Sequence, residues 1–222
     1  MTDKEERSRG QCVYCGNLKI LTRDHVPPKN LFPSPRPSNL ITVPCCYDCN
    51  HQTCMDDEYF RMIISTDPRV SGHHAAKRLW PAVQRSLSNP RKLGLRNVLF
   101  IKTYDTEREL SLQRSKDFKI DCGRINTVLI RIIQGIFFRE KKAILPLSYK
   151  ITVFSPFSSD NLEQKESLKA LIKTYYMVGD GIFSYGMYFY KDYSGASIWS
   201  LSFFENIEFI CTVSPVGDDH LA

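Results

Sequence analysis

Two pairs of cysteines near the start of the chain constrain its fold more than any other feature. Cys12 and Cys15 form one C-x-x-C pair, and Cys46 and Cys49 form a second. A C-x-x-C turn places two thiolates on one tetrahedral ion, and two such turns complete a closed structural zinc site. The paired spacing therefore predicts bound zinc. Cys45 is the alternative third ligand, but the C-x-x-C spacing favours Cys46.

The rest of the composition agrees with this use of cysteine. The 222-residue chain has eight cysteines and begins with a polar, charged segment that lacks the apolar core of a signal peptide. Cysteines in such a chain are typical of a reducing compartment, so we expect a cytoplasmic protein. The most apolar stretch is interrupted by Arg131 and Gln134, which predicts that no segment spans a membrane.

The distribution of apolar residues predicts three parts. We expect residues 1–10 to be a disordered lead. Residues 11–62 are rich in Cys, Pro and Asn, and such a segment buries too little apolar surface to fold without a staple. Residues 63–222 combine helical periodicity with an aromatic, alternating end. This pattern predicts an α+β fold, in which a small metal-stapled module precedes a larger α+β domain with an antiparallel sheet. Within that domain we expect helices over 123–142 and 158–177, and a strand over 96–104.

The stretch LTRDHVPPK lies between the two cysteine pairs and contains Asp24 and His25. Pro27 and Pro28 exclude a helix, because proline lacks an N–H and biases its predecessor away from helical geometry. We therefore expect Asp24 and His25 at the end of a short strand or the start of a loop. Neighbours on a strand point to opposite sides, so both reach one substrate only if the strand is kinked. A solvated turn is the alternative.

The order of these features resembles that of a known family. C-x-x-C is followed by Asp-His, by Asn39 before an apolar strand, and by C-x-x-C-Asn ending at Asn50. This order is similar to that of the zinc-stapled HNH endonucleases, which have the ββα-metal fold. The resemblance covers residues 12 to about 60. Many members have His where this chain has Asn50, followed by His51, and Asn occurs there in relatives of the HNN type.

The resemblance implies a metal-dependent endonuclease that hydrolyses phosphodiester bonds. It implies that His25 is the general base, which suits an imidazole because its pKa is near neutrality. It also implies that Asn39 orients His25, and that Asp24 and Asn50 hold Mg²⁺ or Mn²⁺ beside the structural Zn²⁺. Carboxylate and amide oxygens are suitable ligands for such an ion.

Each of these residues has a structural alternative. Asn39 is also a common turn residue, and Asn50 is also suited to cap the start of a helix. His51 is the alternative to Asn50 as metal ligand. The acidic run at residues 56–58 can bind metal, but it also suits the first turn of a helix.

The basic residues permit a polyanionic partner without requiring one, since runs of charge are usually solvated faces. The formal net charge is +6, and residues 77–102 contain seven Lys or Arg and no acid. DNA is the favoured partner and RNA the alternative, and the oligomeric state is left open. The rival interpretation is a non-catalytic zinc module that binds nucleic acid or protein. The expected phosphate contacts are Arg23, Lys29, Arg36, Lys77 and Arg78.

Overall fold

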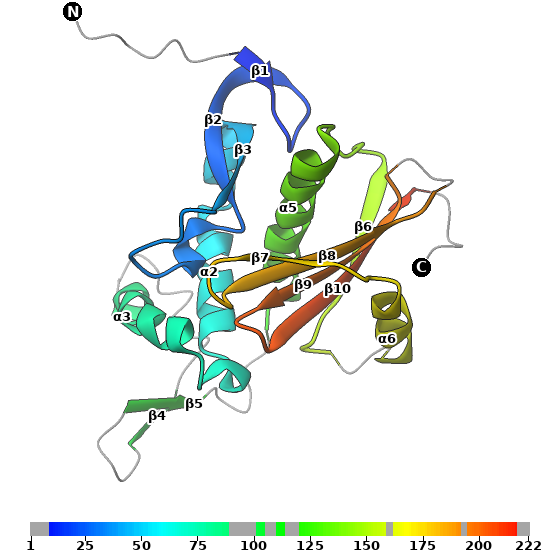
Figure 1. Ribbon diagram of the computed structural model, residues 1–222. Coiled ribbons are helices and arrows are strands. Elements are labelled where there is room, and N and C mark those ends of the chain that lie inside the picture. Colours follow the sequence, from blue (N-terminus) through cyan, green and yellow to red (C-terminus); the bar gives the residue numbers. More distant parts are fainter. Residues whose placement is uncertain are drawn as a thin grey trace, which may run out of the picture.

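The computed structural model describes residues 9–88, 101–104, 110–113, 120–158, 162–191 and 195–216. Within these ranges the chain forms antiparallel sheets of three and five strands, a two-stranded pair and several helices (Figure 1). The fold is mixed α+β, as the sequence predicts. The described α-helices are α1 (Tyr47–Gln52), α2 (Cys54–Ser65), α3 (His74–Ser88), α5 (Cys122–Lys141) and α6 (Leu162–Ala170).

The three-stranded sheet leads directly into two helices. Its strands are β1 (Arg9–Gln11), β2 (Leu18–Val26) and β3 (Ile41–Cys46), in that order across the sheet. β3 ends where α1 begins, and α2 follows, so the two long strands and the helices have a ββα-like arrangement. Asp24 and His25 lie near the C-terminal end of β2, where they pair with Val43 and Thr42 of β3.

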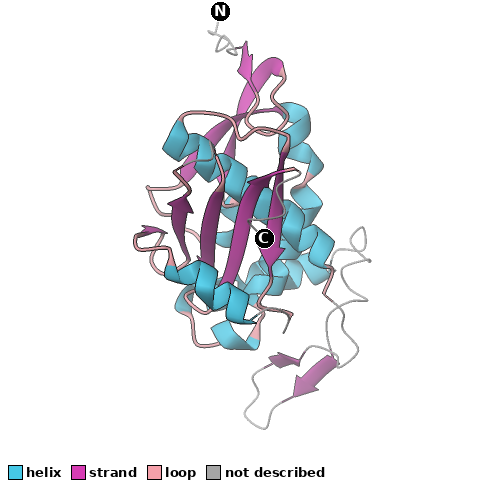
Figure 2. Cartoon of the chain, turned by 90° about the vertical axis from the view of Figure 1, so that its right-hand side faces the viewer, coloured by secondary structure: helices cyan, strands magenta, loops and turns pink. Residues whose placement is uncertain are grey.

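The five-stranded sheet is formed by the C-terminal part of the chain. All its neighbouring strands are antiparallel, and its buried side chains include the aromatic residues Trp199, Phe203 and Phe209. Figure 2 shows this sheet with helices beside it. Across the sheet the strands are β6 (Tyr149–Phe154), β10 (Ile207–Pro215), β9 (Ser197–Phe203), β8 (Phe183–Phe189) and β7 (Tyr175–Val178).

Helix α5 joins the two sheets. It begins at an N-cap, where the Asp121 side chain accepts the Arg124 N–H, and most of its apolar residues are buried. It contacts β2, β3 and α2 on the N-terminal side and β6 on the other. A Cβ on Gly135 would lie 2.6 Å from Val26 Cγ2. The missing side chain therefore lets α5 approach the end of β2, next to His25.

Buried residues from both parts of the chain form one hydrophobic core that includes Cys12 at one end of the sequence and Val213 at the other. Phe60 of α2 shows how the parts meet. Its ring is fully buried and packs edge-on against Phe203 of β9, with centroids 5.0 Å apart. The small N-terminal part therefore shares the core of the larger sheet.

Three expectations differ from the structure or lie beyond it. The helix expected over 158–177 ends at Ala170, because the β-favouring Tyr175 and Tyr176 pair with β8 as strand β7. Of the strand expected over 96–104, only β4 (Ile101–Tyr104) is described, paired with β5 (Leu110–Gln113). Of the lead expected over 1–10, residues 9 and 10 belong to β1, and the others lie outside the described residues.

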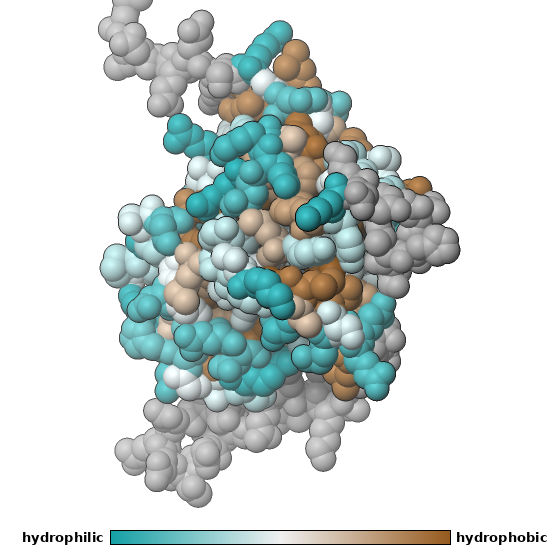
Figure 3. Space-filling view, turned by 45° about the vertical axis from the view of Figure 1, so that its right-hand side comes forward, coloured by the Kyte–Doolittle hydropathy of each residue, from teal (hydrophilic) through white to brown (hydrophobic). Residues whose placement is uncertain are grey.

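The β1–β2 hairpin has exposed apolar side chains, since Leu18 is 74% exposed and Ile20 49%. Figure 3 shows brown residues at the upper end of the molecule and near the middle of this face, among hydrophilic ones. Among the described residues, no helix has the length and apolarity needed to cross a membrane.

Candidate functional site

Four cysteines meet at the junction of the β1–β2 hairpin with α1. The Sγ atoms of Cys12, Cys15, Cys46 and Cys49 all lie within 4.8 Å of one another, and those of Cys15 and Cys46 are 4.0 Å apart. Zn–S bonds of about 2.3 Å in a tetrahedron place sulfurs about 3.8 Å apart. The arrangement therefore fits a structural metal such as zinc, and the expected ligand set is brought together.

The local chain geometry explains the cluster. The first pair lies in a tight turn, in which the Gly16 N–H donates to the Cys12 carbonyl at 2.9 Å and Gly16 has a φ of 70°, a left-handed conformation that favours glycine. Cys46 ends β3, and Cys49 lies one turn into α1. Strand and helix together thus bring the second pair to the first.

The pKa values of two thiols in the cluster bear on whether it holds a cation. Burial raises the pKa of the Cys12 thiol, but the backbone N–H groups of Cys15, Cys46 and Tyr14 lower it more, and the result is about 7. Burial, and the neighbouring Cys46 thiol, raise the pKa of Cys49. A bound cation would favour the deprotonated form of both the Cys12 and the Cys49 thiol.

The neighbouring cysteines lie outside the cluster. Cys45 is buried on the other side of β3, where its Sγ lies 3.5 Å from Thr22 Oγ1. Cys54 is exposed, and its thiol contacts the Asn50 carbonyl at 3.7 Å. The cluster thus contains Cys46 and not Cys45, as the C-x-x-C spacing favours.

Asp24 lies on the inner side of β2 and is surrounded by donors. Its Oδ2 accepts the Tyr14 hydroxyl at 2.7 Å and an Arg131 Nη2 at 2.6 Å, and its Oδ1 accepts the His25 backbone N–H at 2.8 Å. Burial and the Asp24 charge raise the pKa of Tyr14, so its hydroxyl is a donor. A divalent ion does not fit on Oδ2 in this arrangement, because the guanidinium already occupies that oxygen.

Arg131 reaches this carboxylate from α5. Its Nη1 donates to the Cys49 carbonyl, and its guanidinium lies over the Tyr14 ring, 4.1 Å from the centroid. Only 13% of its side chain is exposed, and 17% of that of Asp24. This single side chain therefore links the carboxylate, the second cysteine pair and the first cysteine turn.

A small pocket opens beside this ion pair. Its cavity volume is about 10 Å³, and its lining includes Tyr14, Asp24, His25, Asp57 and Arg131. A cavity of about 10–15 Å³ holds one water. The pocket therefore has room for about one water or a single ion. Burial, opposed by Arg131, raises the pKa of Asp57 to about 7.

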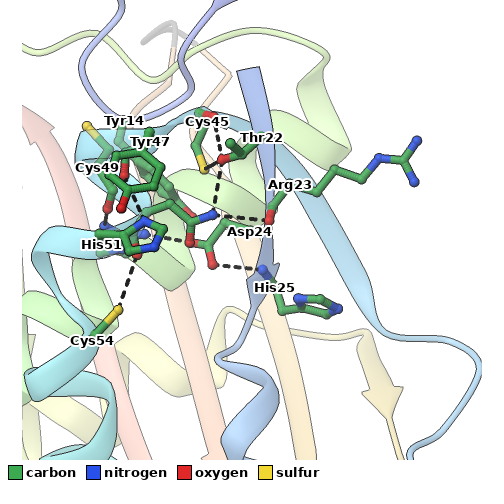
Figure 4. Close-up of polar contacts among 12 residues, drawn as sticks. Tyr14, Thr22, Arg23, Asp24, His25, Cys45, Tyr47, Cys49, His51 and Cys54 are labelled. Atoms are coloured by element: carbon green, nitrogen blue, oxygen red, sulfur yellow. Dashed lines mark hydrogen bonds and ion pairs between the residues drawn. The ribbon is translucent and has the colours of Figure 1, made fainter. Parts of the chain in front are cut away.

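The His25 ring leaves β2 on the side opposite the Asp24 carboxylate. Figure 4 shows the imidazole and the Arg23 side chain on one side of the strand and the carboxylate on the other. No kink turns both side chains to one side, since β2 pairs with β3 through Val26. The two residues nevertheless line the same pocket, because it lies at the end of the strand.

The two asparagines make contacts of their own. Asn50 lies inside α1, whose N-cap is Cys46, so the interpretation of Asn50 as an N-cap is wrong. Its Nδ2 donates to Thr22 Oγ1 at 3.0 Å and the Arg23 carbonyl at 3.3 Å, beside Asp24.

Asn39 donates to the Met177 carbonyl at 3.3 Å, and its Oδ1 accepts the Gly179 N–H. That contact ties the β2–β3 loop to β7, and the role of Asn39 in orienting His25 stays a prediction.

His51, the alternative ligand, lies one residue further along α1. Its exposed ring stacks on that of Tyr47 with centroids 3.8 Å apart, and its Nδ1 lies 3.2 Å from the Tyr47 carbonyl (Figure 4). Both contacts are within α1.

The expected phosphate-binding residues are all exposed. Lys29 and Arg36 act on His25 electrostatically, and the Arg36 Nε donates to the Lys29 carbonyl at 3.4 Å. Arg78 of α3 donates to the Ser34 carbonyl, in the loop that holds Arg36. The structure thus brings Lys29 and Arg36 to the His25 side and Arg78 to their loop. Lys77 is exposed on α3 and is not among the residues that line the pocket.

Three residues of the site were missed by sequence reasoning. Arg131 had a signal, since it is a charge within the most apolar stretch of the chain. Asp57 was considered only as one of the acidic run at 56–58, which suits either a metal or the first turn of a helix, although it lines the pocket with Asp24 and His25. Tyr14, between the first two cysteines, had no signal that predicts contact with Asp24.

We expect the His25 imidazole to titrate below its ordinary pKa of 6.5. Burial is the main cause, and the charges of Lys29 and Arg36 act in the same direction against the opposing charge of Asp24. Replacing Lys29 and Arg36 with Gln should raise the pKa measured from the ring proton signals by NMR. Lys19→Gln, at the other end of β2, is the control and should leave it unchanged.

This shift also sets the sign of the pH effect on stability. Because the pKa of His25 is lower in the folded chain, the unfolded chain binds a proton more readily. The contribution of His25 to the free energy of unfolding therefore falls as pH decreases below about 6.5. A pKa at or above 6.5 in the folded protein would contradict this prediction.

Comparison with protein-family models, curated proteins and solved structures finds no match.

Proposed function

We propose that the protein hydrolyses phosphodiester bonds in nucleic acid, with DNA as the favoured substrate, as the resemblance to HNH endonucleases implies. The observation that supports this most is the position of His25. It lies at the end of β2, lines a pocket with Asp24, and shares its side of the strand with Arg23. An imidazole beside basic side chains suits the hydrolysis of a polyanion.

In this proposal each group has a distinct task. His25 takes a proton from the attacking water, for which its lowered pKa keeps it neutral at physiological pH. Arg23, Lys29 and Arg36 bind phosphates on the outer side of β2. Because the pocket has little empty volume, the polymer approaches across the surface, and only the reacting phosphate meets the pocket.

The four cysteines hold zinc beside the pairing of Leu21 with Cys46, which lies four residues before His25 on β2. A divalent ion such as Mg²⁺ or Mn²⁺, held by Asp24 and Asn50, would supply positive charge for the phosphate and the leaving oxygen. Its fit depends on Arg131, since the guanidinium occupies Asp24 Oδ2 in this structure. No step of the proposal is therefore assigned to the ion.

A second candidate is a zinc module that binds nucleic acid or protein without cleaving it. One observation favours it. The Asp24 carboxylate is satisfied by Tyr14, Arg131 and its own strand, as a structural carboxylate would be. In that case Asp24 serves to attach α5, and the basic residues provide binding alone.

Incubation of the zinc-loaded full chain with supercoiled plasmid separates the candidates. The proposal predicts nicked or linear DNA in Mg²⁺ or Mn²⁺ and intact DNA in excess EDTA, with zinc retention checked in each sample. Salt-dependent binding of a fluorescent duplex without cleavage in any metal would instead support the second candidate.

A further inference from the structure

Arg131 has the contacts of a cation bound in a site. Its guanidinium meets three groups from different elements: the Asp24 carboxylate of β2, the Cys49 carbonyl of α1 and the Tyr14 ring of the first cysteine turn. Burial lowers its pKa, but Tyr14 and Asp24 raise it more, so it remains charged.

The Arg131 charge lies where the resemblance places a divalent ion, on the Asp24 carboxylate. The resemblance to HNH endonucleases implies a divalent ion on Asp24, yet Oδ2 already accepts a guanidinium and a hydroxyl. A metal–oxygen bond of about 2.1 Å to that oxygen would bring two positive charges into contact in a largely buried site. The guanidinium and the ion therefore exclude each other there.

We infer that Arg131 is the resident cation of the Asp24 carboxylate and competes with a divalent ion for it, so that the ion binds only when Arg131 swings away. This inference rests on the divalent-ion site of the proposed function. In this structure, Arg131 holds α5 against β2 and α1.

The same helix provides a matched control. Arg124 lies two helical turns earlier on α5, and its contacts are of the same three kinds. Its Nε pairs with Asp56 at 2.7 Å, its Nη2 donates to the Met55 carbonyl at 2.6 Å, and its guanidinium lies over the Tyr59 ring. Arg124 does not line the pocket. Removing it perturbs the docking of α5 without freeing Asp24.

The test measures Mn²⁺ binding to the zinc-loaded full chain. Calorimetry gives the affinity, and paramagnetic broadening of the His25 and Asn50 amide signals shows whether the ion binds next to Asp24. We expect Arg131→Met to bind Mn²⁺ at least about tenfold more tightly than wild type, because the ion no longer pays for displacing the guanidinium. Arg124→Met should bind like wild type, and Asp24→Asn added to Arg131→Met should remove the gain.

A second variant covers the case in which Arg131→Met does not fold. Arg131→Lys keeps a positive charge but cannot reach the carboxylate and the Cys49 carbonyl with one planar group. It should show an intermediate Mn²⁺ affinity and a larger rise in melting temperature with Mn²⁺ than wild type.

Two results would overturn the inference. If wild type and Arg131→Met bind Mn²⁺ equally and through Asp24, competition is wrong but the divalent site stands. If none of the variants binds Mn²⁺ through Asp24, the inference fails together with the ion of the proposed function.

Discussion

Replacing Cys46 with serine is expected to remove zinc and unfold the protein, because the N-terminal part shares one core with the five-stranded sheet. Structural zinc contributes about 10–16 kcal/mol in zinc-finger peptides, whereas the whole stability of a domain is about 5–15 kcal/mol. Cys46 ends β3, is 1% exposed and has its Sγ 4.0 Å from that of Cys15. Its loss therefore removes both the ion and the connection between the two cysteine turns.

Cys45→Ser is the matched control, because Cys45 is also buried and adjacent but faces Thr22 instead of the cluster. Zinc content by mass spectrometry and the circular dichroism spectrum give the result. The control should keep the zinc content of wild type, and Cys46→Ser should lose it with its native spectrum. Equal zinc in both variants would mean that the cluster does not hold the metal.

Phe60→Ala is expected to lower the free energy of unfolding by about 3–5 kcal/mol, as large-to-small changes of buried aromatic residues do. Phe60 is fully buried in α2, and its ring lies 5.0 Å from Phe203 and 6.4 Å from Phe209, measured between centroids. The cavity would lie where the helix after the cysteine cluster meets the five-stranded sheet. We therefore expect the N-terminal part and the sheet to unfold together in one transition.

Met55→Ala on the same helix is the control. Its side chain is 46% exposed, and substitutions at such positions change stability by about 0.5 kcal/mol or less. Urea unfolding followed by circular dichroism and tryptophan fluorescence measures both variants. A loss of less than about 1 kcal/mol for Phe60→Ala, or two separate transitions, would show that the parts are independent.

The metal cluster could be predicted from the sequence because its geometry is local. Each C-x-x-C pair is one turn, so only one long-range event, the pairing of β2 with β3, joins the four sulfurs. The contact of Arg131 with Asp24 spans 107 residues and depends on how α5 packs. The spacing of residues in the sequence does not predict such a contact. A charged residue within an apolar helix nevertheless indicates that this residue has a partner of opposite charge.

The C-terminal part shows the same limit at the level of secondary structure. The long helix α5 and the strands β8 to β10 have strong periodicity and were expected. β7 was predicted as helix, since its few residues follow a helical segment and acquire strand geometry only by pairing with β8. Similarly, the alternation of side chains along β2 puts Asp24 and His25 on opposite sides, and only the position of the pocket at the strand end lets both line it.

The most direct test of the central claim, that His25 is the general base of a nuclease, is single-turnover plasmid cleavage by wild type, His25→Ala and His51→Ala at equal zinc content. His51 is the control because its exposed ring stacks on Tyr47 within α1. The account predicts that His25→Ala slows cleavage by about 100- to 10,000-fold, as expected for loss of a general base, while His51→Ala cleaves at the wild-type rate. Equal rates for wild type and His25→Ala would contradict it.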